Sequence, residues 1–288
     1  MKILVNLIYY EQGKPNYLDQ IIKEYNSYPY EVDIFIHSNI NNIRNINYSN
    51  YNNGKIVIKK YNLFWRYLIF KNKGYYLTWA PRNFIKANID KYDVFIQTDD
   101  DILIPVNAFN YWLEEKDHLF TRQIIPGFIL LEVDEDGNEF AMGYNKQELD
   151  QFIQIENNEY LVNNNHRYMA SWIYDKSMMK YWIDSGYFDI RKITKVEDLK
   201  SNILDLLNIK SLKFRYLLYN WRNNSGNGIR ENSAYGMNSP NINLIKQVVF
   251  KLENKKFCQQ NKIYHLDVHY SKEDHEIGQT KLNDIYNN

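Results

Sequence analysis

The chain has 288 residues, enough for one large α/β domain, and its 44% hydrophobic content excludes a disordered chain. Basic and acidic residues number 35 each, so the formal net charge is zero, which argues against a general nucleic-acid binder. Cys258 is the only cysteine, which excludes an internal disulfide framework and fits a reducing, cytoplasmic location. The N-terminus lacks a signal-peptide cleavage site, and no stretch has the length and apolarity of a membrane span.

The first hundred residues alternate strand and helix patterns. Helical spacing of apolar residues predicts helices over residues 17–25 and 78–89, and the Asn-rich stretch 39–53 predicts a surface loop. Strands that alternate with helices indicate a parallel, doubly wound sheet, so we expect an α/β fold. Apolar, β-prone runs predict the strands over residues 2–9, 32–37, 55–58 and 93–97.

The second half has a less regular pattern. Residues 124–133 and 139–143 flank a turn-forming run and predict a β-hairpin. A long helical pattern covers residues 195–219, and alternating residues over 262–270 predict a strand. That strand places three potential metal ligands on one face, namely His265, Asp267 and His269.

Three consecutive carboxylates, Asp99, Asp100 and Asp101, follow the strand predicted over residues 93–97. Open α/β sheets bind their ligands at the carboxyl ends of strands. Adjacent acids repel one another unless a cation or hydrogen bonds compensate, and a hard divalent cation such as Mn²⁺ or Mg²⁺ prefers oxygen ligands and shares them with phosphates. The acidic triplet 99–101 therefore predicts a metal-phosphate site. A solvated turn or a helix N-cap cluster is the alternative interpretation.

Upstream of the acidic triplet stands the pair Arg82-Asn83, within the run Ala80-Pro81-Arg82-Asn83-Phe84. Together with the strand that ends in the triplet, this pair resembles the core signature of nucleotide-sugar glycosyltransferases of the GT-A fold, particularly glycosyltransferase family 2. In that family an Arg-Asn pair opens a helix, and a strand ending in Asp-x-Asp follows at about this spacing. The resemblance covers residues 2–104 in layout and is specific at the pair and the triplet.

The resemblance implies a single GT-A-like domain, built on a doubly wound mixed sheet flanked by helices. Residues 1–125 would form its nucleotide-sugar-binding half and residues 126–288 its acceptor-binding half. It also implies metal-dependent sugar transfer from a UDP-, GDP- or dTDP-sugar to a hydroxyl of a glycan, lipid or protein, with the metal stabilising charge on the leaving diphosphate. Two alternatives stay open. One is an inactive carbohydrate-binding or scaffold protein with this fold. The other is a sugar-nucleotidyltransferase, although residues 7–14 carry only one of the glycines that such enzymes use after the first strand.

The resemblance also implies roles for individual residues. Asp101 is the expected direct ligand of Mn²⁺ or Mg²⁺, while Asp99 faces the ribose or also reaches the metal. Asp100 orients the loop or contacts the sugar, and Arg82 meets the diphosphate or a neighbouring carboxylate. Many members carry a late metal-binding histidine, for which His265 is favoured here over His269. The remaining residues expected on the nucleotide side are Tyr9, His37 and Asn83.

An inverting transferase needs a carboxylate base, and the chain offers two candidates. Asp198, in Val196-Glu197-Asp198, resembles the Glu-Asp pair of family 2, although Glu197 also completes a capping box that starts at Thr194. Glu231 follows a glycine-containing loop of the kind that delivers a carboxylate into a cleft, and we favour it slightly.

A basic amphipathic pattern lies within residues 210–222, where Lys and Arg alternate with apolar residues. Such a helix can contact a membrane surface peripherally, or it can be an ordinary helix with one solvated face.

Overall fold

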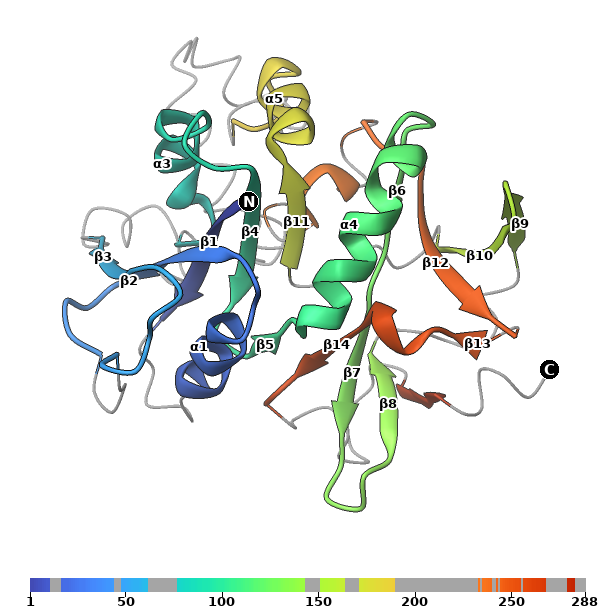
Figure 1. The fold of residues 1–288 in the computed structure, drawn as a ribbon, viewed down its shortest axis with the longest axis horizontal. Helices are drawn as coiled ribbons and strands as arrows, with labels where there is room; N and C mark the ends of the chain where they lie inside the picture. Colours follow the sequence, from blue (N-terminus) through green and yellow to red (C-terminus); the bar gives the residue numbers. More distant parts are fainter. Residues whose placement is uncertain are drawn as a thin grey trace, which may run out of the picture.

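The fold is described from a computed structural model (Figure 1). The residues that the structure describes are 1–10, 17–43, 48–61, 77–142, 151–163, 171–189, 233, 235–239, 242, 244–254, 256–267 and 279–282. Within these ranges, no helix combines the length and apolarity needed to cross a bilayer.

The first sheet has five strands in the order β11-β4-β1-β2-β3. Strands β1 to β4 pair in parallel, and β11 pairs antiparallel with β4, so the sheet is mixed and the expected α/β class is confirmed. All four predicted N-terminal strands are present, and β4 extends to Asp99 itself. The strands are β1 (Lys2–Tyr9), β2 (Glu31–Ser38), β3 (Ile56–Lys60), β4 (Val94–Asp99) and β11 (Ser171–Asp175).

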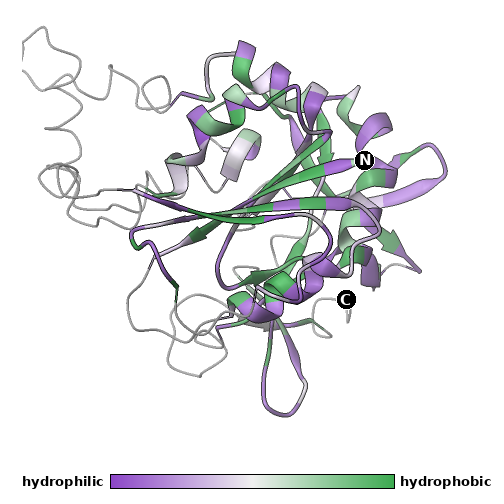
Figure 2. Ribbon diagram, turned by 60° about the vertical axis from the view of Figure 1, so that its left-hand side comes forward, coloured by the Kyte–Doolittle hydropathy of each residue, from purple (hydrophilic) through white to green (hydrophobic). Residues whose placement is uncertain are grey.

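Helices pack their apolar faces against the strands, and Figure 2 shows hydrophobic residues along the central strands and mixed colouring on the helices around them. The helix predicted from residue 78 begins later, at Pro81, because proline at the first helical position needs no amide partner and residues 77–79 form a 3₁₀ turn instead. Asp175 caps the last of these helices by accepting a hydrogen bond from the Met178 amide. The helices are α1 (Leu18–Asn26), α3 (Pro81–Ala87), α4 (Val106–Phe120) and α5 (Lys176–Asp184).

The second sheet has the order β13-β12-β10-β9, with β6 also paired to β12. It lies beyond α4 from the first sheet in the view of Figure 1. Two short 3₁₀ helices accompany the C-terminal strands, η4 (Gly236–Asn238) and η5 (Gln259–Asn261). The strands of this sheet are β6 (Ile124–Pro126), β9 (Phe152–Ile155), β10 (Asn158–Asn163), β12 (Gln247–Glu253) and β13 (Lys256–Phe257).

The third sheet has the order β15-β8-β7-β14-β5 and contains the predicted hairpin, which is confirmed as the antiparallel pair β7–β8. The predicted strand over 124–133 is wrong as a single element, because Gly127 divides it between two sheets. A Cβ at Gly127 would lie 2.6 Å from Val248 Cγ1, so only glycine lets the chain pass β12 this closely. The strands are β5 (Ile102–Leu103), β7 (Ile129–Val133), β8 (Glu139–Met142), β14 (Lys262–His265) and β15 (Gln279–Lys281).

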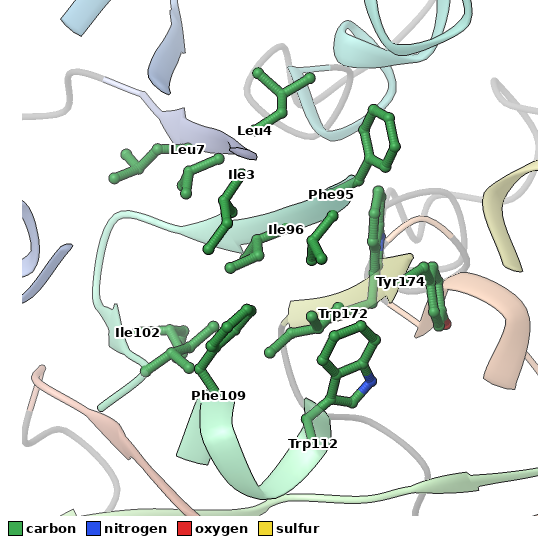
Figure 3. Close-up of a cluster of buried hydrophobic side chains, with 14 of the residues drawn as sticks. Ile3, Leu4, Leu7, Phe95, Ile96, Ile102, Phe109, Trp112, Trp172 and Tyr174 are labelled. Atoms are coloured by element: carbon green, nitrogen blue, oxygen red, sulfur yellow. The ribbon is translucent and has the colours of Figure 1, made fainter. Parts of the chain in front are cut away.

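The main core joins the first sheet to α4 and to β5. Figure 3 shows Phe109 and Trp112 of α4 directed toward Ile96 of β4, Ile102 of β5 and Trp172 of β11. All five side chains are at most 2% exposed. Because Ile102 directly follows the acidic triplet, this packing fixes the chain on the C-terminal side of the predicted site.

Candidate functional site

The acidic triplet lies at the carboxyl edge of the first sheet, where β4 leaves it. Parallel pairing places Ile8 of β1 opposite Asp99, and Tyr9 opposite Ser38 of β2, so three strand ends meet there. Asp99 is buried at 8% exposure, while Asp100 and Asp101 are half-buried. This edge is the one expected to bind ligands in an open α/β sheet.

Strand β14 brings His265 to the acidic triplet from the far end of the sequence. It pairs antiparallel with β5, so that His265 lies opposite Ile102, and the Leu266 amide donates to the Asp101 carbonyl over 2.7 Å. The distance from His265 Nε2 to Asp101 Oδ2 is 3.5 Å. The structure thus places the favoured late histidine beside the expected metal-binding carboxylate, and its role as a ligand stays a prediction.

Glu132 contacts the other ring nitrogen of His265. Its Oε1 lies 2.9 Å from His265 Nδ1, and the carboxylate is fully buried on β7, the strand that pairs with β14. Burial lowers the pKa of His265, but the hydrogen bonds that its ring donates to Asp101 and Glu132, with the charges of these two acids, outweigh burial and raise the pKa to about 9. The imidazole therefore carries a proton on both nitrogens at neutral pH in the metal-free protein.

Sequence reasoning missed Glu132. The only signal was a single acid inside the apolar run Ile129-Leu130-Leu131-Glu132-Val133, where a buried carboxylate is costly without a partner. Nothing in the sequence indicated that the partner would be His265, which lies 133 residues away along the chain.

Tyr17 and Asp267 are coupled electrostatically to the region of the acidic triplet. Burial raises the pKa of the Tyr17 hydroxyl, and the charges of Asp267 and Asp101 raise it further. Asp267 lies in a bend, because β14 ends at His265 and the strand predicted over 262–270 is shorter than expected. The antiparallel pairing of β14 with β5 ends at His265, because β5 has only two residues. His269 lies outside the described residues.

The chemistry of these donors fits a divalent cation. Carboxylate oxygens from Asp99 and Asp101 with an imidazole nitrogen from His265 form a set that Mn²⁺ accepts, and phosphate oxygens of a bound nucleotide would fill other positions. Among the described residues, no group of three or more His, Cys, Asp or Glu side chains already stands in metal-binding geometry.

Arg82 of α3 is buried in a box of aromatic rings. Its Cζ atom is 4.2 Å from the ring centre of Trp182, 4.5 Å from that of Phe188 and 4.7 Å from that of Trp79. Nη2 donates to Ser233 Oγ over 3.1 Å, whereas Nε and Nη1 have no acceptor in the described part of the chain. Burial lowers the pKa of the guanidinium to about 9. The aromatic rings stabilise the buried cation, and its expected contact with a diphosphate stays a prediction.

His37 is a buried neutral residue between strands. Nε2 lies 3.0 Å from Asn6 Oδ1 and Nδ1 lies 2.9 Å from the Tyr61 hydroxyl. Burial, together with the charge of Lys59, lowers the pKa of the imidazole to about 3. Both ring nitrogens are thus used within the fold.

The other expected nucleotide-side residues lie in different surroundings. Tyr9 is buried at the end of β1, and Asn83 is exposed on α3 beside Arg82. Both predicted bases, Asp198 and Glu231, lie outside the described residues, so their assignment stays a prediction.

Comparison with known proteins gives a distant structural likeness. No protein-family model and no curated protein matches the sequence. A crystal structure of S. aureus TarS is similar over 62% of this chain and 29% of that chain, at 13% identity and a TM-score of 0.35. A second, of S. aureus TarS 1-349, is similar over 92% of this chain and 60% of that chain, at 12% identity and a TM-score of 0.39. This chain therefore spans less than two thirds of the length of either of those chains.

Proposed function

We propose that this protein is a metal-dependent glycosyltransferase that moves a sugar from a nucleotide-diphosphate donor to a hydroxyl acceptor. The observation that supports this is the cluster at the carboxyl edge of the first sheet, where His265 Nε2 lies 3.5 Å from Asp101 Oδ2 and Asp99 is the last residue of β4. An acidic edge repels the phosphates of a nucleotide unless a cation lies between them. A carboxylate-imidazole cluster at a strand end is therefore suited to hold a metal-diphosphate group.

In this proposal, Asp101 and His265 hold Mn²⁺ or Mg²⁺, and Asp99 holds the ribose or shares the metal. When bound, the metal supplies charge stabilisation to the leaving diphosphate. Glu231, or alternatively Asp198, takes the proton from the acceptor hydroxyl as the sugar is transferred. Residues 1–125 would bind a UDP-, GDP- or dTDP-sugar, and residues 126–288 of the same domain would shape the site for a glycan, lipid or protein acceptor. A cytoplasmic location is part of the proposal, since Cys258 is a free thiol.

Thermal unfolding with UDP-, GDP- and dTDP-sugars, each with and without Mn²⁺, tests this function. A ligand that binds only the folded chain at about 100 times its Kd stabilises it by about 2.7 kcal/mol, which raises the unfolding midpoint by a few degrees. We expect such a shift with one nucleotide, only when Mn²⁺ is present, and its loss in Asp101→Asn. The matched control is Asp136→Asn, because Asp136 is an exposed carboxylate in the turn between β7 and β8.

The same preparations separate donor binding from catalysis. Glu231→Gln should keep the metal-dependent shift and lose sugar transfer by about 10²- to 10⁴-fold, the usual contribution of a general base. A shift without metal, or one that persists in Asp101→Asn, would contradict the metal assignment. Binding without transfer to any acceptor would favour the inactive binding protein.

A further inference from the structure

Glu132 is a buried carboxylate for which the proposed function provides no role. It lies on the central strand β7 of the third sheet, and its side chain has no exposure to solvent. The parallel register pairs Leu131 with Tyr264, so the next residues along the two strands are Glu132 and His265. The two side chains therefore meet because of the strand pairing, and Glu132 Oε1 lies 2.9 Å from His265 Nδ1.

A hydrogen bond at one ring nitrogen of histidine determines what the other nitrogen can do. A carboxylate accepts a hydrogen bond only from an N–H group. Glu132 lies 2.9 Å from Nδ1, nearer than Asp101 lies to Nε2, so the neutral ring keeps its proton at Nδ1 and its lone pair at Nε2. The same hydrogen bond fixes the rotation of the ring, and it directs Nε2 toward Asp101 Oδ2 at 3.5 Å. Carboxylates that contact metal-binding histidines in this way orient the ring and raise its basicity as a ligand.

We propose that Glu132 is a positioning residue, which holds His265 with Nε2 on the side of Asp101, where a divalent cation is bound. The inference has two parts. That a cation binds at Nε2 rests on the proposed function, whereas the orientation of the His265 ring by Glu132 does not. Glu132 would not contact the cation or the sugar donor itself, and it would act through His265 alone.

A second buried glutamate offers a matched control. Glu115 on α4 is 3% exposed, and its Oε2 lies 3.3 Å from His118 Nε2, so it is also a buried acid beside a histidine. Its other oxygen accepts from Lys251 Nζ over 2.6 Å, within the contact between α4 and the second sheet. Substitution of Glu115 therefore perturbs a buried Glu-His pair outside the acidic triplet.

The first test measures the Mn²⁺ dissociation constant of the full chain by electron paramagnetic resonance of free Mn²⁺, with UDP, GDP and dTDP in turn. Glu132→Ala should weaken Mn²⁺ binding by about 10- to 100-fold, the usual effect of removing such a partner. Glu132→Gln should weaken it less, because the amide oxygen still accepts from Nδ1–H. Glu115→Gln should leave the dissociation constant unchanged. An unchanged constant in folded Glu132→Ala would overturn the proposal, and so would equal weakening in Glu115→Gln.

The second test determines the tautomer of the neutral ring directly, in the absence of metal and at a pH above the His265 pKa of about 9. In ¹⁵N-labelled protein, with the neutral imidazole assigned through His265→Gln, the proton should lie on Nδ1 in the wild type and in Glu132→Gln. It should move to Nε2 in Glu132→Ala. A proton on Nε2 in the wild type would overturn this inference alone. Failure of the wild type to bind Mn²⁺ would instead overturn the proposed function, and with it the part of the inference that places a cation at Nε2.

Discussion

His37 shows how burial turns a titratable residue into a structural one. The side chain lies at the end of β2, where a ligand contact was expected, yet Asn6 and Tyr61 occupy both of its ring nitrogens. Its pKa is lowered to about 3, mainly because burial penalises the charged ring. In the unfolded chain the ring would return to its ordinary pKa of about 6.5.

This difference predicts a pH dependence of stability. Between pH 6.5 and 3 the unfolded chain binds a proton that the folded chain does not, so the free energy of unfolding falls as the pH falls through this window. Between pH 7.5 and pH 5, protonation of His37 in the unfolded chain should lower the free energy of unfolding by about 2 kcal/mol. We therefore expect the free energy of unfolding, measured with urea, to fall by about 2 kcal/mol more in the wild type than in His37→Gln over this pH range. The amide of the glutamine can keep both contacts of the histidine. Equal losses in the two proteins would contradict the prediction.

At the scale of elements, short segments distant in sequence hold the strands of the first sheet in place. Ser233 donates its hydroxyl to the Thr78 carbonyl and accepts from Arg82 and Gln97, which links it to α3 and β4. Just after it, the amide of Met237 in η4 donates to the Tyr174 hydroxyl on β11. The η4 segment thus covers the antiparallel edge of the sheet at close range.

Gly236 makes this close contact, which gives a prediction for η4. Its φ is +58°, and a Cβ there would lie 2.6 Å from the Tyr174 hydroxyl and 3.0 Å from Trp172. Gly137 also has a positive φ, of +81°, but a Cβ there would meet nothing within 4 Å. Gly137→Ala should therefore lower the free energy of unfolding by about 1 kcal/mol, because alanine is strained at a positive φ. Gly236→Ala should cost about 1–3 kcal/mol more, because the methyl group overpacks the core.

Urea unfolding of the two glycine variants at pH 7.5 measures this difference. The slope of the free energy against urea should be the same in both, because the same surface is exposed on unfolding. Equal destabilisation of the two variants would show that the contact between η4 and β11 contributes nothing.

At the scale of the whole molecule, the acidic triplet connects two sheets. Strand β4 belongs to the first sheet and β5 to the third, so residues 99–101 cross from one to the other. The core is continuous across this junction, since Ile102 and Ile263 pack in the same cluster as the strands of the first sheet. Residues from both sheets and from both halves of the chain therefore lie beside the triplet, as the contact of His265 with Asp101 shows.

The sequence by itself determined the local features of this protein. Apolar, β-prone runs located β1 to β4 correctly. The acids at the end of β4 could be predicted as a site because their mutual repulsion is a property of adjacent residues. Tertiary structure alone decided which distant residues meet there. The registers of β14 with β5 and β7 bring His265 to Asp101 and Glu132, and packing encloses Arg82 in aromatic rings. Periodicity specifies which face a side chain occupies, but the partner on that face depends on strand pairing over more than a hundred residues.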